Sequence, residues 1–136
     1  MPDKKISALT AASALAGTEV LPVVQSSETK KATITQILTG QLITEATTTR
    51  TLSATDNGKI IYCTSGSATT INCAAGLGVG FNCTIIQGGA GKVTVAANSQ
   101  TLVSYSSLFS TMGQYAVISL ICPVANTFVA AGNLGV

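Results

Sequence analysis

Short runs of apolar and β-branched residues, separated by turn residues, dominate the chain after Arg50. The runs lie at 59–64, 69–73, 81–87, 92–96, 115–122 and 127–131. Clusters of Gly, Asn, Ser and Asp separate them, and no apolar periodicity of helix length occurs in this part. This alternation is typical of an all-β sandwich or barrel. We therefore predict a small β-sandwich or jelly-roll-like domain over residues 47–136.

The first 46 residues follow a mixed pattern. Residues 19–25 form an apolar run that predicts an extended segment, and Pro22 excludes it from the centre of a sheet. Thr33 and Gln36 fit a capping box, and the apolar residues that follow share one helical face, namely Ile34, Ile37, Leu38 and Leu42. We expect residues 1–46 to form an extended N-terminal arm with a short helix whose apolar face needs a partner.

Charge is almost confined to the first part of the chain. From Ile60 to Val136 the single charged side chain is Lys92, and the sequence contains no histidine. Soluble domains usually devote about a quarter of their residues to charge. Without histidine, the usual general base for nucleophilic catalysis is missing. A paired-carboxylate mechanism would need two of the five acids, all of which precede Ile60. We expect a structural or binding protein, without enzymatic activity, cofactor or metal site.

The glycine-rich segment 88–92 resembles a phosphate-binding loop only in part. That motif needs a glycine at the position of Ile86 and a serine or threonine at the position of Val93. We interpret the segment as a hairpin turn.

Charge and hydropathy also limit the partners. The net charge of +2 comes without a basic stripe, so we expect no nucleic-acid binding. No run approaches the roughly 18 apolar residues of a membrane helix, so we expect no membrane contact. Lys4 and Lys5 are followed by a stretch that polar residues break too early for a secretory signal. We therefore expect assembly in a cytoplasm.

The four cysteines have no CxxC spacing, and each takes a position where a strand would place a small apolar residue: Cys63, Cys73, Cys83 and Cys122. This pattern favours buried, reduced thiols over a zinc site. Disulfides remain the alternative.

Two stretches resemble bacteriophage virion proteins. Residues 5–9, 14–25 and 29–38 are similar to an N-terminal segment of many phage fibre and capsid-appendage proteins. In that group, the segment attaches the protein to the particle. The resemblance and the apolar pattern together give the candidate attachment residues, which are Ile6, Leu9, Val20, Leu21, Val23, Ile34, Ile37, Leu38 and Leu42.

The second stretch, residues 56–136, is similar to a small, typically trimeric β domain of phage head and tail appendages. Its matching motifs lie at 56–62, 85–95, 113–121 and 126–132. Phe128 stands where that group often has tryptophan, and Asn133 where an acidic residue is common. These departures argue against importing a ligand-binding role from the group.

The resemblance implies a homotrimeric capsid decoration (cement) protein or short head fibre of the virion. Its partner would be the major capsid protein or a neighbouring virion protein. The alternative is a tail adaptor or small tail fibre that binds the host surface. Sugar binding favours exposed aromatic residues beside carboxylates. The chain offers only three tyrosines, three phenylalanines and few acids, which disfavours a lectin role.

Overall fold

The computed structural model describes residues 20–33 and 41–136 of the chain, which divides into two compact units, Met1–Gly40 and Gln41–Val136. In the first, the N-terminal unit, β1 (Val20–Gln25) and β2 (Glu28–Thr33) pair as an antiparallel hairpin. Ser26 and Ser27 connect them with φ of 53° and 62°. Two successive positive φ values match the twist of a two-residue hairpin turn. The extended segment expected at 19–25 is thus confirmed over its described residues, 20–25, as β1.

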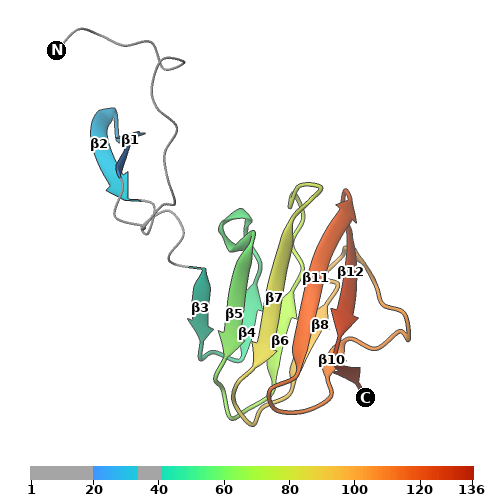
Figure 1. The fold of residues 1–136 in the computed structure, drawn as a ribbon. Coiled ribbons are helices and arrows are strands. Elements are labelled where there is room, and N and C mark those ends of the chain that lie inside the picture. The colour runs from blue at the N-terminus through green and yellow to red at the C-terminus, as the bar shows by residue number, and fades with distance from the viewer. Residues whose placement is uncertain (1–19, 34–40) are drawn as a thin grey trace, which may run out of the picture. The chain divides into compact units, whose positions relative to one another are not determined.

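The second unit, which we call the β unit, winds back and forth between two sheets (Figure 1). β3 (Leu42–Glu45), β5 (Lys59–Cys63) and β7 (Asn82–Gln87) are parallel neighbours in a six-stranded sheet. The strands between them, β4 (Thr49–Thr51), β6 (Thr69–Asn72) and β8 (Val93–Ala96), are parallel neighbours in a five-stranded sheet. Because the chain changes sheet after each strand, these strands form stacked coils of a short solenoid.

Mostly antiparallel strands complete both sheets. The five-stranded sheet gains β10 (Ser110–Thr111) and β13 (Leu134–Gly135) beside β8. The six-stranded sheet gains β11 (Val117–Val124) and β12 (Thr127–Gly132) beside β7, and then β9 (Thr101–Val103), which runs parallel to β12. The one described 3₁₀ turn, η2 (Ala54–Asp56), lies between β4 and β5.

The all-β prediction is confirmed for the described residues, but the jelly-roll-like sandwich is wrong. The glycine-rich segment 88–92 was interpreted as a hairpin turn, whereas residues 88–91 form a corner that leads from β7 into β8 of the other sheet. A Cβ on Gly89 would lie 2.2 Å from the Ser65 carbonyl oxygen, and one on Gly91 would lie 1.9 Å from that of Ser67. The glycines are therefore needed because successive corners stack backbone against backbone.

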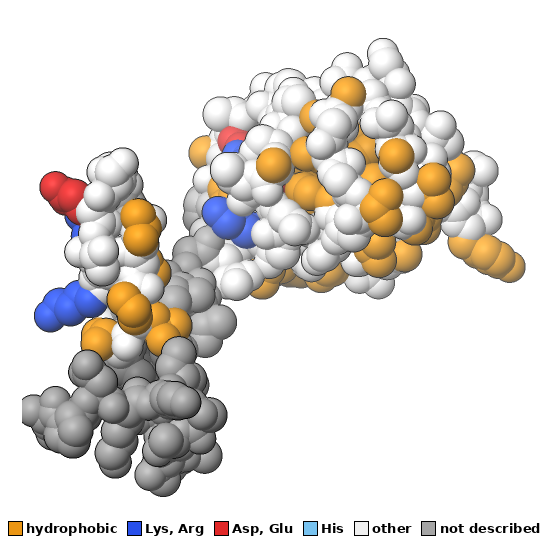
Figure 2. All heavy atoms as spheres, turned by 90° about the horizontal axis from the view of Figure 1, so that it is seen from above, with side chains coloured by type: hydrophobic (Ala, Val, Ile, Leu, Met, Phe, Trp, Pro, Cys, Tyr) orange, Lys and Arg blue, Asp and Glu red, His pale blue; other side chains and the backbone are white. Residues whose placement is uncertain are grey.

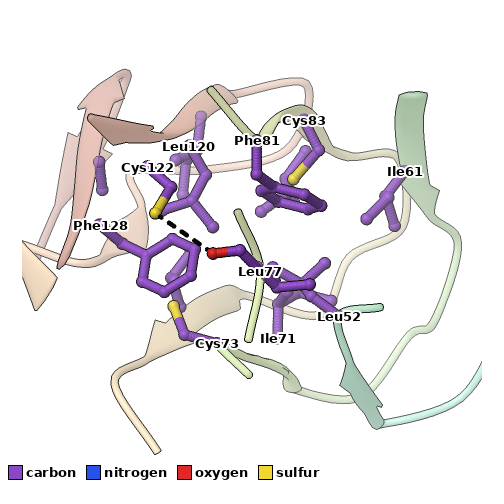
Figure 3. Packing of buried hydrophobic residues seen from close by; sticks show 14 of the residues in the cluster. Leu52, Ile61, Ile71, Cys73, Leu77, Phe81, Cys83, Leu120, Cys122 and Phe128 are labelled. Carbon is purple, nitrogen blue, oxygen red and sulfur yellow. Dashed lines mark hydrogen bonds between the residues drawn. The ribbon is translucent and has the colours of Figure 1, made fainter. Parts of the chain in front are cut away.

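The core lies between the two sheets and is built in register along the solenoid. Ile61, Ile85 and Ile118 pair side by side on β5, β7 and β11, and all three are fully buried. Phe81 and Phe128 meet edge to face, with ring centroids 6.4 Å apart. Figure 3 shows these rings between leucine, isoleucine and cysteine side chains of both sheets. Stacked aliphatic side chains thus replace the interdigitated core of a sandwich.

The expected helix is not confirmed. Thr33, its proposed first residue, ends strand β2, and Leu42, its proposed last apolar residue, begins strand β3. Residues 34–40 lie outside the described part of the chain. β3 pairs with β5 along its whole length, so the structural division falls at Gly40 and Gln41 and not after residue 46. Tertiary pairing with β5 explains why a local helical pattern misplaced Leu42.

Candidate functional site

The candidate attachment residues divide between the two units. Val20, Leu21 and Val23 lie on β1 of the hairpin, and Leu42 lies on β3 of the β unit. Ile6, Leu9, Ile34, Ile37 and Leu38 lie outside the described residues. The structure therefore brings three of the nine together on one strand.

The hairpin presents much of its apolar surface. Val20, Leu21 and Val24 are 54%, 46% and 77% exposed. Glu28 and Lys30 form an exposed ion pair at 3.6 Å on β2. An isolated two-stranded sheet is marginally stable in water. Val20 and Val24 share one face of β1, so the hairpin gains stability when that face contacts another surface.

A second feature, the ionic cluster of Glu45, Arg50 and Asp56, lies where the solenoid begins. Arg50 Nη1 donates to Glu45 Oε2 at 2.9 Å, and Arg50 Nη2 donates to Asp56 Oδ1 at 2.6 Å. Asp56 is fully buried, and Glu45 is nearly so. Along β4, β6 and β8 the position of Arg50 is taken by Ile71 and then Val95. The first coil thus has a polar interior where the later coils are aliphatic.

Backbone and hydroxyl groups complete the hydrogen bonding of both carboxylates. Thr47 donates its backbone N–H and its hydroxyl to Glu45 Oε1, at 2.9 and 2.6 Å. Ser53 donates its backbone N–H to Asp56 Oδ2 at 2.8 Å. Burial alone would raise the pKa of Glu45, but the bonds from Thr47 and Arg50 outweigh it and hold that pKa below its usual value. Glu45 therefore stays ionised at neutral pH, and the ionic cluster closes the end of the core.

A third feature is the outward face of the six-stranded sheet, which we call the apolar face. Because side chains alternate along a strand, the neighbours of the buried core residues point outward. One row across β5, β7 and β11 consists of Tyr62, Ile86 and Val117. The other aliphatic members of the apolar face are Leu42, Ile60, Ile121, Val129, Ala131 and Val103. Its polar members are Thr44, Asn82, Thr84, Ser119, Thr101 and Thr127.

No charged residue lies on the apolar face. The charged residues of the β unit are Glu45, Arg50, Asp56, Lys59 and Lys92, none of which occupies an outward position of the six-stranded sheet. Figure 2 shows the visible charges of this unit near one end, with hydrophobic and uncharged polar side chains over the remainder of that view.

The outward face of the five-stranded sheet, which we call the hydroxyl face, has a different composition. Its central row is Thr49, Thr70, Thr94 and Ser110, in register across four strands. Thr94 Oγ1 and Ser110 Oγ hydrogen-bond at 2.9 Å. Threonine in a strand combines a good β-former with a hydroxyl that water solvates. The solenoid therefore has one face suited to water and one that is largely aliphatic.

The sequence analysis did not identify the apolar face, although adjacent apolar residues within the strands indicate it. A strand with one wet face alternates apolar and polar residues, whereas β5, β7 and β11 contain the adjacent apolar pairs Ile60–Ile61, Ile85–Ile86 and Val117–Ile118. Such pairs indicate strands that are apolar on both sides. Once the structure shows which residue of each pair points into the core, the other residue is known to point outward.

The cysteines are all buried, as predicted, and the structure holds them as free thiols. Burial raises the pKa of Cys63 and Cys73 to about 11 and that of Cys83 to about 12. The Cys122 thiol donates to the Val124 carbonyl oxygen at 3.2 Å. Protonated, enclosed thiols of this kind act as small core residues.

Residues 20–33 and 41–136 contain no group of three His, Cys, Asp or Glu side chains that could hold a metal ion. Within the same ranges, no helix has the length and apolar character needed to cross a membrane. The sequence matches no protein-family profile and no curated protein.

Proposed function

We propose that the chain is a structural component of a bacteriophage particle, a homotrimeric capsid decoration protein or short head fibre. The N-terminal unit attaches it to the major capsid protein or a neighbouring virion protein, and the β unit is the displayed part. The resemblance of residues 5–38 and 56–136 to phage appendage proteins supplies the particle and the trimer. The structure contributes a physical reason for the attachment.

The observation that carries this proposal is the exposure of the hairpin. Val20, Leu21 and Val24 are exposed on a two-stranded sheet, a structure that is only marginally stable on its own. Contact with a virion protein would bury these side chains and order the hairpin. The favourable free energy of the contact has to exceed the entropic cost of that ordering. The three hairpins of one trimer would bind the particle simultaneously. Once one hairpin is bound, the other two are held near their sites at a high effective concentration.

A tail adaptor or small tail fibre is the second candidate. Tyr105 is fully exposed, and Tyr115 is 70% exposed with a positive φ of 66°. A strained backbone that displays an aromatic ring is found at binding sites. Gln114, beside it, donates its side-chain N–H to the Gly88 carbonyl oxygen at 2.8 Å. The rings of Tyr105 and Tyr115 are suited to stack on a sugar, and the Gln114 amide lies next to Tyr115 in the chain.

Immunogold electron microscopy of purified particles of the encoding phage tests both candidates. Label on the capsid shell in groups of three copies supports the decoration protein. Label at the tail supports the second candidate. Absence of the protein from particles, checked by mass spectrometry of the same preparation, would overturn the proposal that it is a virion component.

A further inference from the structure

We propose that the apolar face is buried between copies of this chain, three of which turn their six-stranded sheets toward a common axis. This inference rests on the homotrimer in the proposed function and adds the surface through which the copies meet. The hydroxyl face then points outward to solvent.

The size of the apolar face is the first argument. Six strands at about 4.8 Å spacing and about five residues of 3.3 Å each cover roughly 400 Å². Threonine, serine and asparagine share this area with the aliphatic side chains. The largest apolar patch on a typical soluble protein is about this size and is often functional. Leu42, on the edge strand β3, is 59% exposed, Ile121 on β11 is 44% exposed, and Ile60, Tyr62 and Ile86 are half-buried.

The chemistry of the apolar face favours a second copy over another kind of partner. Partners that meet and separate usually rely on complementary charges for specificity, and this face has none. Permanent homomeric interfaces are more apolar and poorer in charge. A largely aliphatic and uncharged face can pack against the same face of another copy. Copies of the chain are also made together, so this partner is always available. Like-charge repulsion across this contact is small, because no charged side chain lies on the apolar face and the charges of the ionic cluster are paired with one another. Lys59, at the start of β5, has the inward register of Ile61.

The contrast between the two faces gives a matched pair of substitutions. Ile86 lies outward on β7, and Thr94 lies outward on β8, the middle strand of the other sheet. Both side chains are half-buried, and both have paired strands on each side. Ile86→Lys places a charge in the centre of the apolar face, and Thr94→Lys places the same charge on the hydroxyl face.

Sedimentation equilibrium of the full chain over a range of concentrations measures the outcome. We expect a trimer for the wild type and for Thr94→Lys, and association weakened by about 30-fold or more for Ile86→Lys. Ile86→Thr, which keeps a β-branched residue and makes the apolar face resemble the hydroxyl face, should weaken association less without unfolding the chain. Circular dichroism checks that each variant is folded.

The results separate this inference from the proposal on which it rests. A trimeric wild type whose Ile86→Lys and Ile86→Thr variants associate equally well would overturn the assignment of the apolar face and leave the homotrimer standing. A monomeric wild type would overturn both. If Thr94→Lys also disrupts the trimer, the copies do not meet through the apolar face alone, and the assignment is wrong as stated.

Discussion

Arg50 Nη2 lies 2.6 Å from Asp56 Oδ1, and this contact joins β4 to the turn that leads into β5. The same guanidinium holds Glu45 at the end of β3. A solenoid has an open end where its first coil has no preceding coil to cover it. Here the open end is closed by three charged side chains, and both buried carboxylates have Arg50 as a partner, although Arg50 Nε is itself buried without a hydrogen bond.

Replacing Arg50 tests the role of the ionic cluster. Arg50→Met leaves Glu45 and Asp56 enclosed without a cation, and we expect a loss of about 3 kcal/mol in the free energy of unfolding. Lys59→Met, which removes a positive charge outside the ionic cluster, should change stability by less than about 0.5 kcal/mol. Urea denaturation of both variants gives the comparison. Equal effects would mean that the ionic cluster contributes nothing beyond net charge.

Acid should weaken the first coil. The pKa of Glu45 lies below its usual 4.5 in the folded protein, so the unfolded chain binds this proton more readily than the folded chain. The stabilisation is therefore complete above about pH 4.5 and is lost as the pH falls through the lowered pKa. Thermal melting between pH 7 and pH 3 should show this decline, and Glu45→Gln should show a shallower one. Identical pH profiles for the two proteins would exclude a contribution from Glu45.

The cysteines should resist modification in the folded protein. Because the four thiols are buried and the pKa of Cys83 is raised to about 12, few are accessible thiolates at pH 8. A colorimetric thiol reagent should label them slowly in native buffer and label all four in denaturant. Reductant should leave the melting temperature unchanged. A drop in melting temperature with reductant would reveal a stabilising disulfide and contradict the free-thiol assignment.

The stacked corners give a test of the solenoid itself. Gly91→Ala would place a methyl group 1.9 Å from the Ser67 carbonyl oxygen, so the two corners have to separate. We expect a loss of at least about 2 kcal/mol, in the range of overpacking in a dense interior. Gly66→Ala in the facing corner meets nothing within 4 Å and should be nearly neutral. If the two variants unfold at the same urea concentration, the corners are not in contact.

The sequence predicted individual strands better than their arrangement. The strands β5, β6, β7, β8, β11 and β12 all fall on runs that were expected, because each run is apolar or β-branched and has turn residues at its ends. Such runs do not encode which strand pairs with which. Parallel pairing of β5 with β7 depends on corner geometry at Gly89 and Gly91, and turn composition alone does not distinguish a corner from a hairpin.

The candidate site was only partly predictable for the same reason. Val20, Leu21 and Val23 were identified from an apolar run, and they lie on one strand. Leu42 was assigned to a helix by periodicity, and its pairing with Ile60 overrides that local preference. The ionic cluster was missed because Glu45, Arg50 and Asp56 are brought together by the path of β3, β4 and η2, which no spacing rule describes.

Removal of the N-terminal unit tests the central claim most directly. Residues 41–136 keep β3, so this truncated chain retains every strand of the β unit and should fold. Particles of the encoding phage that lack the protein would be mixed with the full chain or with residues 41–136. The number of chains bound per particle would then be measured after the particles are sedimented. The account predicts normal occupancy for the full chain and almost none for the folded residues 41–136. Equal occupancy would contradict attachment through the N-terminal unit and assign it to the β unit.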